Sequence, residues 1–358
     1  MSSIRLGVLG CGFIGHQHLR AAQRLSNVQV VAVVDADCLR AKATAEEFNV
    51  CASGSQASVI LDNADIDAVV LAIPTAGRTE LALAAFRAGK HVLLEKPAAM
   101  NASEVRSMLA AKGNLTCACG SSRYRFTNAA RRATRFLVDG ALGDLRMLRC
   151  RAVQAVGAPP ASSPPPWRVN RQINGGGILV NWGSYDLDFL LGITGWSFKP
   201  AEVLAQTWRI ARDLSAHVAP GSDAESHVSA LIRCHQDRCI ALERGEFLAA
   251  PSEHTWEIIG SQGSLRINMC RIAGPYSLTH YRADPQRGVV SEVLWTASAA
   301  ESTQDDQILA DGPLQDFVAA IGNQRPPQTG LEQALTIVQI TDAIYASALS
   351  GRALTIAA

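Results

Sequence analysis

The stretch Ile4-Arg5-Leu6-Gly7-Val8-Leu9-Gly10-Cys11-Gly12-Phe13-Ile14-Gly15 decides the fold of the first part of this 358-residue chain. Its first six residues, mostly apolar with Arg5 as the one charged side chain, predict a strand, and residues 16–25 carry a helical pattern. A strand, a turn of the form G-x-G-x-x-G and a helix, in that order, are typical of the first unit of a dinucleotide-binding sheet. The pattern therefore predicts a nucleotide site at the start of the chain.

Each glycine of this turn has a separate expected role. Gly10 permits the tight turn, Gly12 lets the backbone approach a pyrophosphate, and Gly15 lets the helix pack against the strand. Phe13 and Ile14 lie between them, where the helix N-terminus offers N–H groups and a partial positive charge to the phosphates. We expect all five residues to line the cofactor site.

An acid at the end of the second expected strand addresses the choice of dinucleotide. Residues 28–34 predict this strand, and Asp35 follows it twenty residues after Gly15. A carboxylate there accepts a hydrogen bond from a ribose 2′-hydroxyl and repels a 2′-phosphate. Asp37 adds a second acid, whereas Arg40 lies one helical turn further on. The balance favours NAD over NADP.

Strand-like and helical stretches alternate up to about residue 120, which predicts a doubly wound parallel sheet. Further strands are expected at residues 67–73, 91–95 and 115–120, and helices at residues 41–48, 78–89 and 103–112. Pro74-Thr75 follows one of these strands and Glu95-Lys96-Pro97 ends another. Ligands bind at the carboxyl edge of such sheets, so we expect Pro74, Thr75, Glu95 and Lys96 to contact the cofactor.

Lys96 is the candidate catalytic cation. Pro97 fixes its own φ and restricts Lys96 to extended geometry, so the ammonium group is held in a defined direction. A solvated lysine before a turn is the alternative interpretation. The position directly after a buried strand favours a role in the site.

Composition argues against several other classes of protein. A net charge of +1 argues against nucleic acid as the main partner, since phosphate binding needs concentrated lysine and arginine. No run of eighteen apolar residues exists, so no membrane span is expected, and the first strand begins too early to leave room for a signal peptide. These features predict a cytoplasmic protein.

The nine cysteines are scattered and odd in number, which argues against a disulfide framework. Cys117-Ala118-Cys119 and Cys234-His235 with Cys239 lack the C-x-x-C spacing of a zinc site and lie in strand-like segments. We expect them to be small buried apolar residues and expect no metal site.

The second part of the chain has a different character. A helix is expected at residues 129–138, a strand at residues 144–156, and an extended loop over the Pro-, Ser- and Ala-rich residues 157–166. Short strand-like runs then recur from residue 202 to residue 295, which predicts a large, mainly antiparallel sheet. Two helices are expected to close the chain, at residues 313–322 and 331–350.

Between these regions, Gly175-Gly176-Gly177 precedes an apolar helical stretch that carries Asn181, Tyr185 and Asp188. At 3.6 residues per turn these three side chains share one polar stripe, with leucines on the opposite side against a core. A polar stripe on a buried helix needs partners or a cavity, and the alternative is an ordinary solvated face. The stripe predicts the second half of the site.

With these motifs, the chain resembles the glucose–fructose oxidoreductase / inositol dehydrogenase / rhizopine-catabolism family, written Gfo/Idh/MocA, over nearly its whole length. The resemblance rests on residues 10–15, 88–97 (Ala-Gly-Lys-His-Val-Leu-Leu-Glu-Lys-Pro), Trp167-Arg168, 175–188 and 259–263. It implies a Rossmann domain over residues 1–121. Over residues 122–358 it implies a C-terminal α/β domain with an open, mainly antiparallel sheet that commonly forms homodimers or homotetramers.

The resemblance also implies that Lys96 contacts the substrate hydroxyl and the nicotinamide ribose. The family usually has Asp where Asn181 stands and His where Tyr185 stands, although some sugar-oxidoreducing members use Tyr there as acid/base. Arg78 replaces a His often found in the loop after Pro74, which leaves the contacts of that loop open.

The chemistry explains why Lys96 and Tyr185 suit the reaction. Hydride transfer from a carbinol carbon to nicotinamide requires a base for the hydroxyl proton and a cation facing the developing alkoxide. A free tyrosine has a pKa of about 10, and a nearby lysine ammonium lowers it. We expect the two to act as a coupled pair, and the sequence leaves open which of them accepts the proton.

The leading hypothesis is an NAD(H)-dependent oxidoreductase acting on a small polyhydroxy substrate: a sugar, cyclitol or related polyol. The groups expected to bind its hydroxyls are Arg125, Trp167, Arg168, Asn181 and Asp188. One alternative, known among relatives of this fold, cleaves glycosides by transient oxidation, elimination and re-reduction, with NAD recycled. Another is a dinucleotide-sensing regulator, as in a galactose pathway; Lys96 and Tyr185 argue against it, since a sensor needs neither.

Overall fold

The protein is described by a computed structural model, which covers residues 3–270 and 274–357. The chain folds into two compact units. The first consists of Met1–Arg123 and Gln307–Val338, and the second consists of Tyr124–Asp306 and Gln339–Ala358.

The return of residues 307–338 to the first unit differs from the expected single C-terminal domain over residues 122–358. Two groups of apolar side chains explain it. Leu314, Phe317 and Val318 pack into one core of the first unit. Leu331, Ala334 and Val338 pack into its other core. The sequence pattern of these helices shows that one face is apolar, but it does not show which core that face joins.

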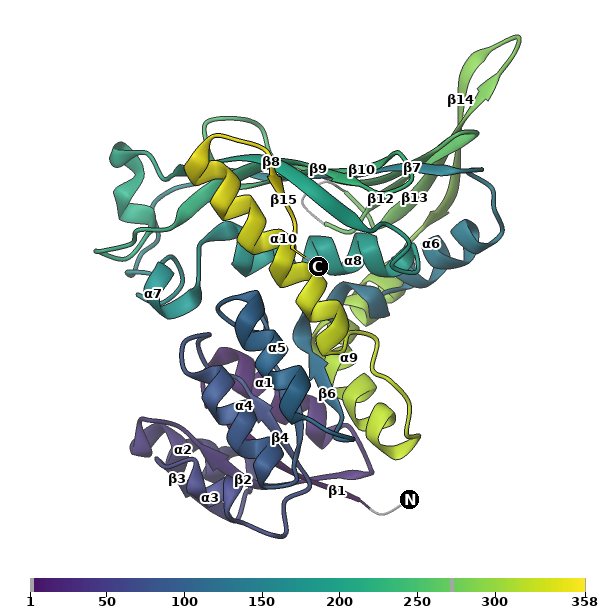
Figure 1. Ribbon diagram of the computed structural model, residues 1–358. Helices are drawn as coiled ribbons and strands as arrows, with labels where there is room; N and C mark the ends of the chain where they lie inside the picture. Colours follow the sequence, from purple (N-terminus) through teal and green to yellow (C-terminus); the bar gives the residue numbers. More distant parts are fainter. Residues whose placement is uncertain (1–2, 271–273, 358) are drawn as a thin grey trace. The chain divides into compact units, whose positions relative to one another are not determined.

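The first unit is built on a six-stranded parallel sheet in the order β3-β2-β1-β4-β5-β6 (Figure 1). Its strands are β1 Ile4–Leu9, β2 Val28–Val34, β3 Ala52–Gly54, β4 Ala68–Leu71, β5 His91–Leu94 and β6 Cys117–Cys119. Its first five helices are α1 Phe13–Gln23, α2 Cys38–Phe48, α3 Ser58–Leu61, α4 Arg78–Arg87 and α5 Ala102–Ala111. β3 and α3 were not predicted, because they are too short to show a period.

Helices cover both faces of this sheet, which confirms the doubly wound arrangement. Leu6 and Val8 of β1 point into a core that includes residues of α1 and α2. The next residue, Leu9, points into a core that includes residues of α3, α4 and α5. The alternation follows from the two-residue period of a strand.

The parallel register places the ends of four strands side by side. Leu9 pairs with both Val34 and Leu71, and Leu71 pairs with Leu94. The segments that follow these strand ends are therefore brought to one edge of the sheet: the glycine turn, Asp35, residues 72–75 and Glu95-Lys96. This is the carboxyl edge, where ligands bind in sheets of this kind.

The second unit is built on a nine-stranded sheet in the order β14-β13-β12-β11-β7-β10-β9-β8-β15. Its strands are β7 Leu145–Ala155, β8 Pro200–Arg209, β9 Glu225–Cys234, β10 Arg238–Leu248, β11 Glu253–Gly260, β12 Gly263–Asn268, β13 Ser277–Asp284, β14 Gly288–Thr296 and β15 Leu354–Thr355. Among the described strand pairs of this second sheet only β10 and β7 run parallel, which confirms the mainly antiparallel arrangement.

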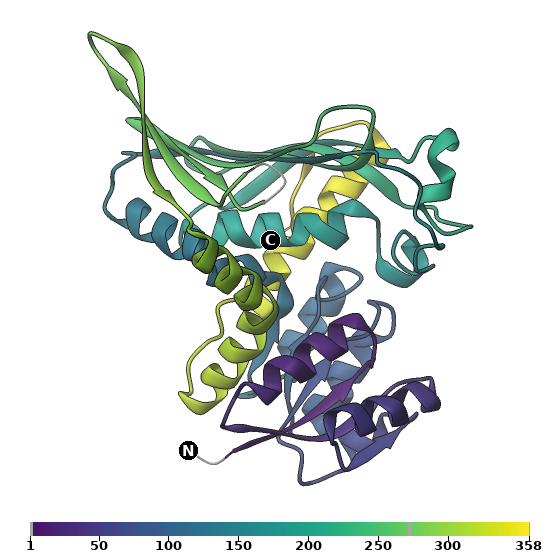
Figure 2. The same cartoon turned by 180° about the vertical axis from the view of Figure 1, so that it is seen from behind.

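Helices α6 and α8 lie along one face of this sheet, and the opposite face has no helix across it in the described residues (Figures 1 and 2). The hairpin of β13 and β14 projects beyond the other strands (Figure 1). The shorter elements from residue 120 to residue 217 are η1 Gly120–Phe126, α6 Asn128–Val138, α7 Arg171–Asn174, η2 Leu179–Gly183, α8 Ser184–Ile193 and η3 Arg212–His217. Residues 157–165 contain no helix or strand, as expected for the extended loop.

Two long helices, α9 Ala299–Gly322 and α10 Leu331–Ser350, contribute to both units. The prediction that the first of them begins at Pro313 was wrong, because this proline lies inside α9. None of the helices in the described part of the chain combines the length and apolar character that a membrane span requires.

Candidate active site

The glycine turn after β1 has the geometry expected for a dinucleotide loop. Gly10 has a φ of +98°, and a Cβ there would lie 2.3 Å from the carbonyl oxygen of Ala72. A Cβ on Gly15 would lie 1.8 Å from the carbonyl oxygen of Gly10, so the helix packs directly on the turn. A Cβ on Gly12 would meet no atom within 4 Å. Close packing thus requires glycine at positions 10 and 15, whereas Gly12 leaves the room that a pyrophosphate needs.

The N-terminus of α1 is suited to an anion. The helix begins at Phe13, and Gly12 at the N-cap supplies no side-chain hydrogen bond to the first turn. The first-turn N–H groups, including that of Ile14, therefore suit phosphate oxygens, which the helix dipole also favours. Phe13 is 75% exposed beside them, an apolar surface for a bound cofactor. These features fit the pyrophosphate of NAD.

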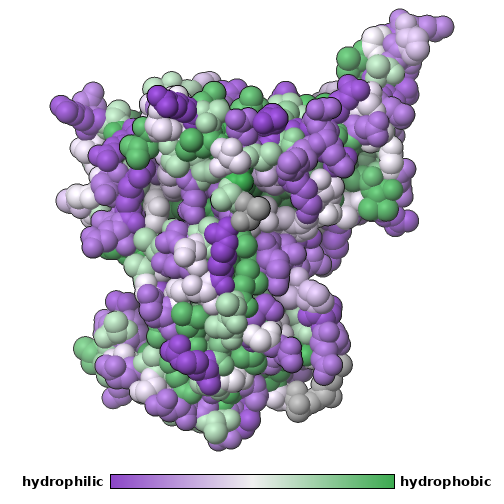
Figure 3. All heavy atoms as spheres, viewed as in Figure 1, coloured by the Kyte–Doolittle hydropathy of each residue, from purple (hydrophilic) through white to green (hydrophobic). Residues whose placement is uncertain are grey.

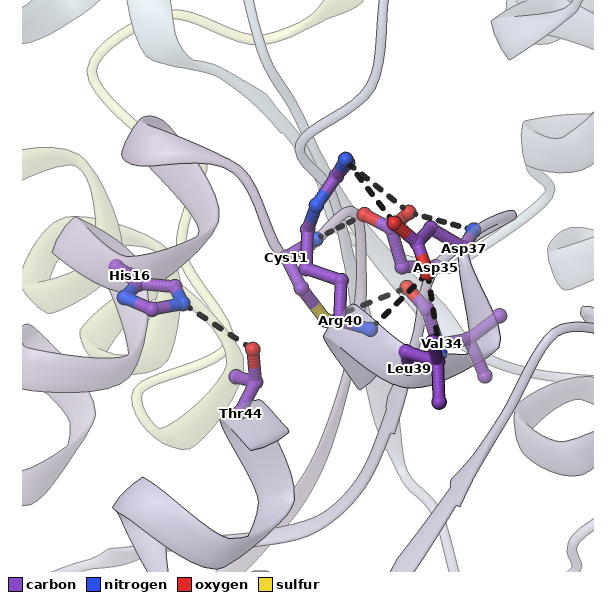
Figure 4. A network of polar contacts seen from close by, with 8 residues as sticks. All are labelled: Cys11, His16, Val34, Asp35, Asp37, Leu39, Arg40 and Thr44. Carbon is purple, nitrogen blue, oxygen red and sulfur yellow. Dashed lines mark hydrogen bonds and ion pairs between the residues drawn. The ribbon is translucent and has the colours of Figure 1, made fainter. Parts of the chain in front are cut away.

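Asp35 is fixed by donors from three residues (Figure 4). One carboxylate oxygen accepts from the N–H of Cys11 at 2.8 Å, and the other accepts from the N–H of Asp37 at 2.9 Å. Arg40 lies 3.3 Å from Asp35 and 3.4 Å from Asp37, so its guanidinium is directed at the two acids. The arrangement holds a carboxylate at the end of β2, where a ribose hydroxyl binds in this fold.

Arg78 is a clamp whose role the sequence left open. It is 2% exposed, and it donates to the carbonyl oxygens of Glu95 at 2.5 Å, of Pro97 and of Ile73. Burial lowers the pKa of Arg78 to about 10, against the opposing effect of the Glu95 carboxylate, so the guanidinium is charged at neutral pH. Arg78 thus ties together the segments that follow β4 and β5.

Glu95 lies buried within the segment that follows β5. Its carboxylate is 2.9 Å from Nε2 of His18, accepts from the Lys96 N–H at 3.2 Å and lies 3.6 Å from Arg123. Burial raises the pKa of Glu95, but the hydrogen bond from His18 and the charges of Arg123 and Lys96 outweigh it, and the pKa falls to about 2. Glu95 is therefore an ionised anchor for Lys96. His18 and Arg123 were not predicted, since no local pattern joins residues so far apart.

The remaining predicted residues of this edge differ in exposure. Lys96 is half-buried, and the Lys96–Pro97 peptide bond is cis. Thr75 is fully buried, whereas the neighbouring Pro74 is exposed. The first unit therefore brings together, at one sheet edge, all of the residues predicted to bind the cofactor.

Two glycines of the triplet in the second unit, Gly176 and Gly177, are required by close packing. A Cβ on Gly176 would lie 1.9 Å from the hydroxyl oxygen of Tyr345, and a Cβ on Gly177 would lie 1.8 Å from the backbone oxygen of Glu225. The Glu225 carboxylate accepts from the N–H groups of Gly177 and Leu179 at 3.1 Å and from the Tyr345 hydroxyl at 2.8 Å. A buried carboxylate thus caps the helical segment that carries Asn181.

The helix that carries the predicted polar stripe is not regular throughout. Leu179–Gly183 is a single π-helical turn, and α8 begins only at Ser184, so the spacing of 3.6 residues per turn does not hold from Asn181 to Tyr185. Every residue of α8 is buried, so the alternative of an ordinary solvated face does not hold for Tyr185 and Asp188, and the shared polar stripe stays a prediction. π-helical turns inside helices are common at functional sites.

Tyr185 belongs to a chain of aromatic contacts within the second unit. Its ring centroid lies 5.4 Å from that of Tyr124 and 5.8 Å from that of Trp182. Tyr124 is 6.2 Å from Trp256, whose indole N–H donates to Asp186 at 2.9 Å. The position of the Tyr185 ring is therefore set by aromatic neighbours from η1 and η2.

A buried ion pair completes this arrangement. Asp186 lies 3.5 Å from Arg244, and the guanidinium carbon of Arg244 lies 5.2 Å from the ring centroid of Trp182. Burial raises the pKa of Asp186, and the effects of Arg244 and Trp256 offset only part of that increase. Asp186, Arg244 and Trp182 were not predicted, because their importance depends on contacts between α8 and the sheet.

The other predicted substrate residues occupy two places in the second unit. Arg125 lies 3.9 Å from Asp188, which is fully buried. Trp167 and Arg168 lie on a turn after the extended loop; Trp167 is 38% exposed, and Arg168 lies 2.5 Å from Glu246. The cysteines considered as metal ligands, Cys117, Cys119, Cys234 and Cys239, are free thiols in strands.

Two families of known sequences match this chain. The "Oxidoreductase family, NAD-binding Rossmann fold" matches residues 4–121, and the "GFO/IDH/MocA C-terminal domain" matches residues 130–266. The chain belongs to the Gfo/Idh/MocA family. This membership confirms the resemblance inferred from the motifs and identifies the first unit as an NAD-binding Rossmann domain.

Curated members of the Gfo/Idh/MocA family align with most of the chain. The 1,5-anhydro-D-fructose reductase of Ensifer adhaerens is 30% identical over 263 residues, which cover 73% of this chain and 74% of the relative. The levoglucosan dehydrogenase of Pseudarthrobacter phenanthrenivorans is 28% identical over 293 residues, 75% of this chain and 74% of the relative.

Solved structures show the same fold over the whole chain. An oxidoreductase domain protein from Kribbella flavida superposes with a TM-score of 0.85 at 22% identity and covers 100% of both chains. A levoglucosan dehydrogenase in complex with NADH and levoglucosan superposes with a TM-score of 0.84 at 23% identity, again over 100% of both chains.

Proposed function

We propose that this chain is an NAD(H)-dependent oxidoreductase that transfers hydride between nicotinamide and a carbinol carbon of a sugar, cyclitol or related polyol. The observation that carries the proposal is the strand register that brings the glycine turn, Asp35 and the anchored Lys96 to one edge of the Rossmann sheet. The relatives support the substrate class, because they include an anhydrofructose reductase and a levoglucosan dehydrogenase.

In this proposal NAD supplies the hydride acceptor, and the chain supplies the groups that move the proton. Lys96 provides the cation for the developing alkoxide, because Glu95 holds its backbone in place. Tyr185 exchanges the hydroxyl proton, because Tyr124 and Trp182 fix its ring. Arg125, Trp167, Arg168, Asn181 and Asp188 remain the predicted hydroxyl-binding set, with the buried Asp188 acting through Arg125.

The test is a polyol screen that follows NADH absorbance with the parent protein, Lys96→Ala, Tyr185→Phe and the double variant. Loss of a general acid/base is expected to lower kcat by about 10² to 10⁴, and loss of the cation by about 10² to 10³. Because residues that act as a unit are not additive, the double variant should be little worse than the poorer single variant. NADH affinity, measured by fluorescence titration, should stay within about threefold of the parent for Tyr185→Phe.

The same screen separates the alternatives. Near-parental turnover in Tyr185→Phe would exclude the proton-transfer role. Consumption of a glycoside without net NADH would favour the cleaving reaction in which NAD is recycled. NAD binding with no turnover on any polyol or glycoside would favour the regulator.

We also propose that the protein is a homodimer or homotetramer. Leu204 of β8 and Leu231 of β9 pair in register and are 52% and 54% exposed, whereas their strand neighbours Val203 and Ile232 are fully buried, so the two leucines point to the opposite, exposed face of the sheet. Hydrophobic and hydrophilic residues are intermixed at the surface in the upper part of the view in Figure 3. Exposed apolar side chains on a large sheet face favour association with a second copy. The cytoplasmic location inferred from the sequence stays a prediction.

Light scattering tests this assembly. At micromolar concentration the parent protein should have at least twice the mass of the 38.1 kDa chain. Leu231→Glu should shift it toward monomer, because the new charge would be buried in the interface. Leu349→Glu is the matched control, since Leu349 is a leucine of the same unit that is 92% exposed and lies on helix α10 and not on a strand of the sheet. A parent protein that is monomeric throughout would contradict the proposal.

A further inference from the structure

Trp182 is an exposed aromatic side chain next to the predicted catalytic tyrosine. It lies in the π-helical turn η2 and is 38% exposed, although the other residues of that turn are buried. Its ring centroid is 5.8 Å from that of Tyr185, and the two planes meet at 63°. Single exposed apolar side chains are common on protein surfaces, so its position beside Tyr185 and the groups that hold it are the informative features.

The indole is held by buried groups rather than by surface contacts. Arg244 is 7% exposed, and its guanidinium carbon lies 5.2 Å from the Trp182 ring centroid, a cation–π distance. Arg244 is itself fixed by fully buried Asp186, which accepts a hydrogen bond from Trp256. A flexible surface tryptophan would need no such support. The ring is preorganised, with part of its surface left accessible.

We propose that Trp182 is a stacking platform for the apolar face of a ring-shaped polyol, so that the substrate is a pyranose, anhydrosugar or cyclitol rather than an acyclic polyol. This inference rests on the proposed function and narrows its substrate class. A sugar ring presents hydroxyls at its rim and C–H groups on its faces. Aromatic side chains pack against such faces, and a few polar groups form hydrogen bonds with the hydroxyls. An acyclic polyol has no comparable rigid face.

Stacking also explains why the platform adjoins Tyr185. A six-membered ring that lies flat on the indole projects its equatorial hydroxyls close to its mean plane, and the neighbouring, inclined Tyr185 ring is then a candidate to contact one of them. The expected kinetic consequence is selective. Removal of the indole should lower kcat/KM for ring substrates and leave that for acyclic substrates nearly unchanged.

The experiment compares 1,5-anhydro-D-glucitol and myo-inositol, which are rings, with D-glucitol, which is acyclic, each with NAD. The variants are Trp182→Leu, which keeps an apolar side chain without a π face, and Trp182→Phe, which keeps a smaller face. Trp295→Phe is the control, because Arg132 lies 5.2 Å over the Trp295 ring, the same distance as Arg244 over Trp182.

Trp182→Leu should lower the ratio of kcat/KM for ring over acyclic substrates by about tenfold, the size of a good aromatic contact with its buried area. Trp182→Phe should lower it by about threefold, and Trp295→Phe should leave it unchanged. If Trp182→Leu does not fold, the Trp182→Phe ratio decides. An unchanged ratio, or an equal loss on rings and acyclic polyols, overturns the platform while leaving the oxidoreductase in place.

Failure of the proposed function has a different signature. If the parent protein forms no NADH with any polyol, calorimetric titration of the protein–NAD complex with the two rings follows. Ring binding that is weakened in Trp182→Leu and not in Trp295→Phe would support the platform without the reaction. Absence of ring binding at millimolar concentration would overturn both the platform and the proposed function.

Discussion

Replacing Glu95 by glutamine should remove the buried negative charge that accepts a hydrogen bond from the Lys96 N–H, while preserving the shape of the side chain. The carboxylate is held by His18, by the Lys96 N–H and by Arg123, and these partners lower its pKa from 4.5 to about 2. A group whose folded pKa is depressed stabilises the fold fully above its unfolded pKa and loses that contribution as pH falls through the folded value. The relevant window therefore runs from about pH 4.5 down to about pH 2.

The magnitude follows from these two pKa values. A decrease from 4.5 to about 2 corresponds to about 3 kcal/mol of stability at neutral pH, since one pKa unit is about 1.4 kcal/mol. At pH 3.5 the same titration leaves about 2 kcal/mol. Glu95→Gln should therefore be less stable than the parent by about 3 kcal/mol at pH 7, and the difference should shrink to about 2 kcal/mol at pH 3.5.

The assay is urea unfolding at the two pH values, followed by far-ultraviolet circular dichroism. Tryptophan fluorescence is recorded in parallel, because all six tryptophans lie in the second unit and report on it alone. Glu46→Gln is the control, since Glu46 is an exposed glutamate on α2 of the same unit as Glu95. A Glu95→Gln difference below about 0.5 kcal/mol at pH 7, or one that stays constant with pH, would refute the anchor.

Three further substitutions test the cofactor site of the first unit and the packing within each unit. Asp35→Ala should narrow or reverse the preference for NAD over NADP in calorimetric titrations, because the carboxylate repels a 2′-phosphate; a parent protein that prefers NADP would contradict the assignment. Gly177→Ala should lower the free energy of unfolding by more than about 3 kcal/mol, because its Cβ would lie 1.8 Å from the Glu225 carbonyl oxygen. Gly157→Ala is the control: its Cβ would meet no atom within 4 Å, so the free energy of unfolding should change by less than about 0.5 kcal/mol. Arg78→Lys should lower the free energy of unfolding by about 2 kcal/mol and weaken NAD binding, because one ammonium group cannot replace a guanidinium that donates to three carbonyl oxygens. A variant with the melting temperature and NAD affinity of the parent protein would contradict this role of Arg78.

The sequence by itself determined the features that depend on neighbours along the chain. The G-x-G-x-x-G turn, the strand before it and the acid after β2 are encoded in short patterns, and their roles follow from steric rules for glycine and the period of a strand. The position of Lys96 at a ligand-binding sheet edge was predictable for the same reason. Once the elements are known to alternate, parallel pairing brings their carboxyl ends together.

Only the tertiary structure decided which distant side chains complete these local features. Three contacts join residues that no short pattern connects: the hydrogen bond of His18 with Glu95, the hydrogen bonds of Arg78 to the segments after β4 and β5, and the cation–π contact of Arg244 with Trp182. The π-helical turn at Leu179–Gly183 escaped prediction because its sequence is compatible with a regular helix, and packing of Gly176 and Gly177 against Tyr345 and Glu225 accompanies the departure. Residues 307–338 join the first unit for the same physical reason: an apolar helical face is a local property, whereas the core that buries it is fixed by the free energy of packing the whole chain.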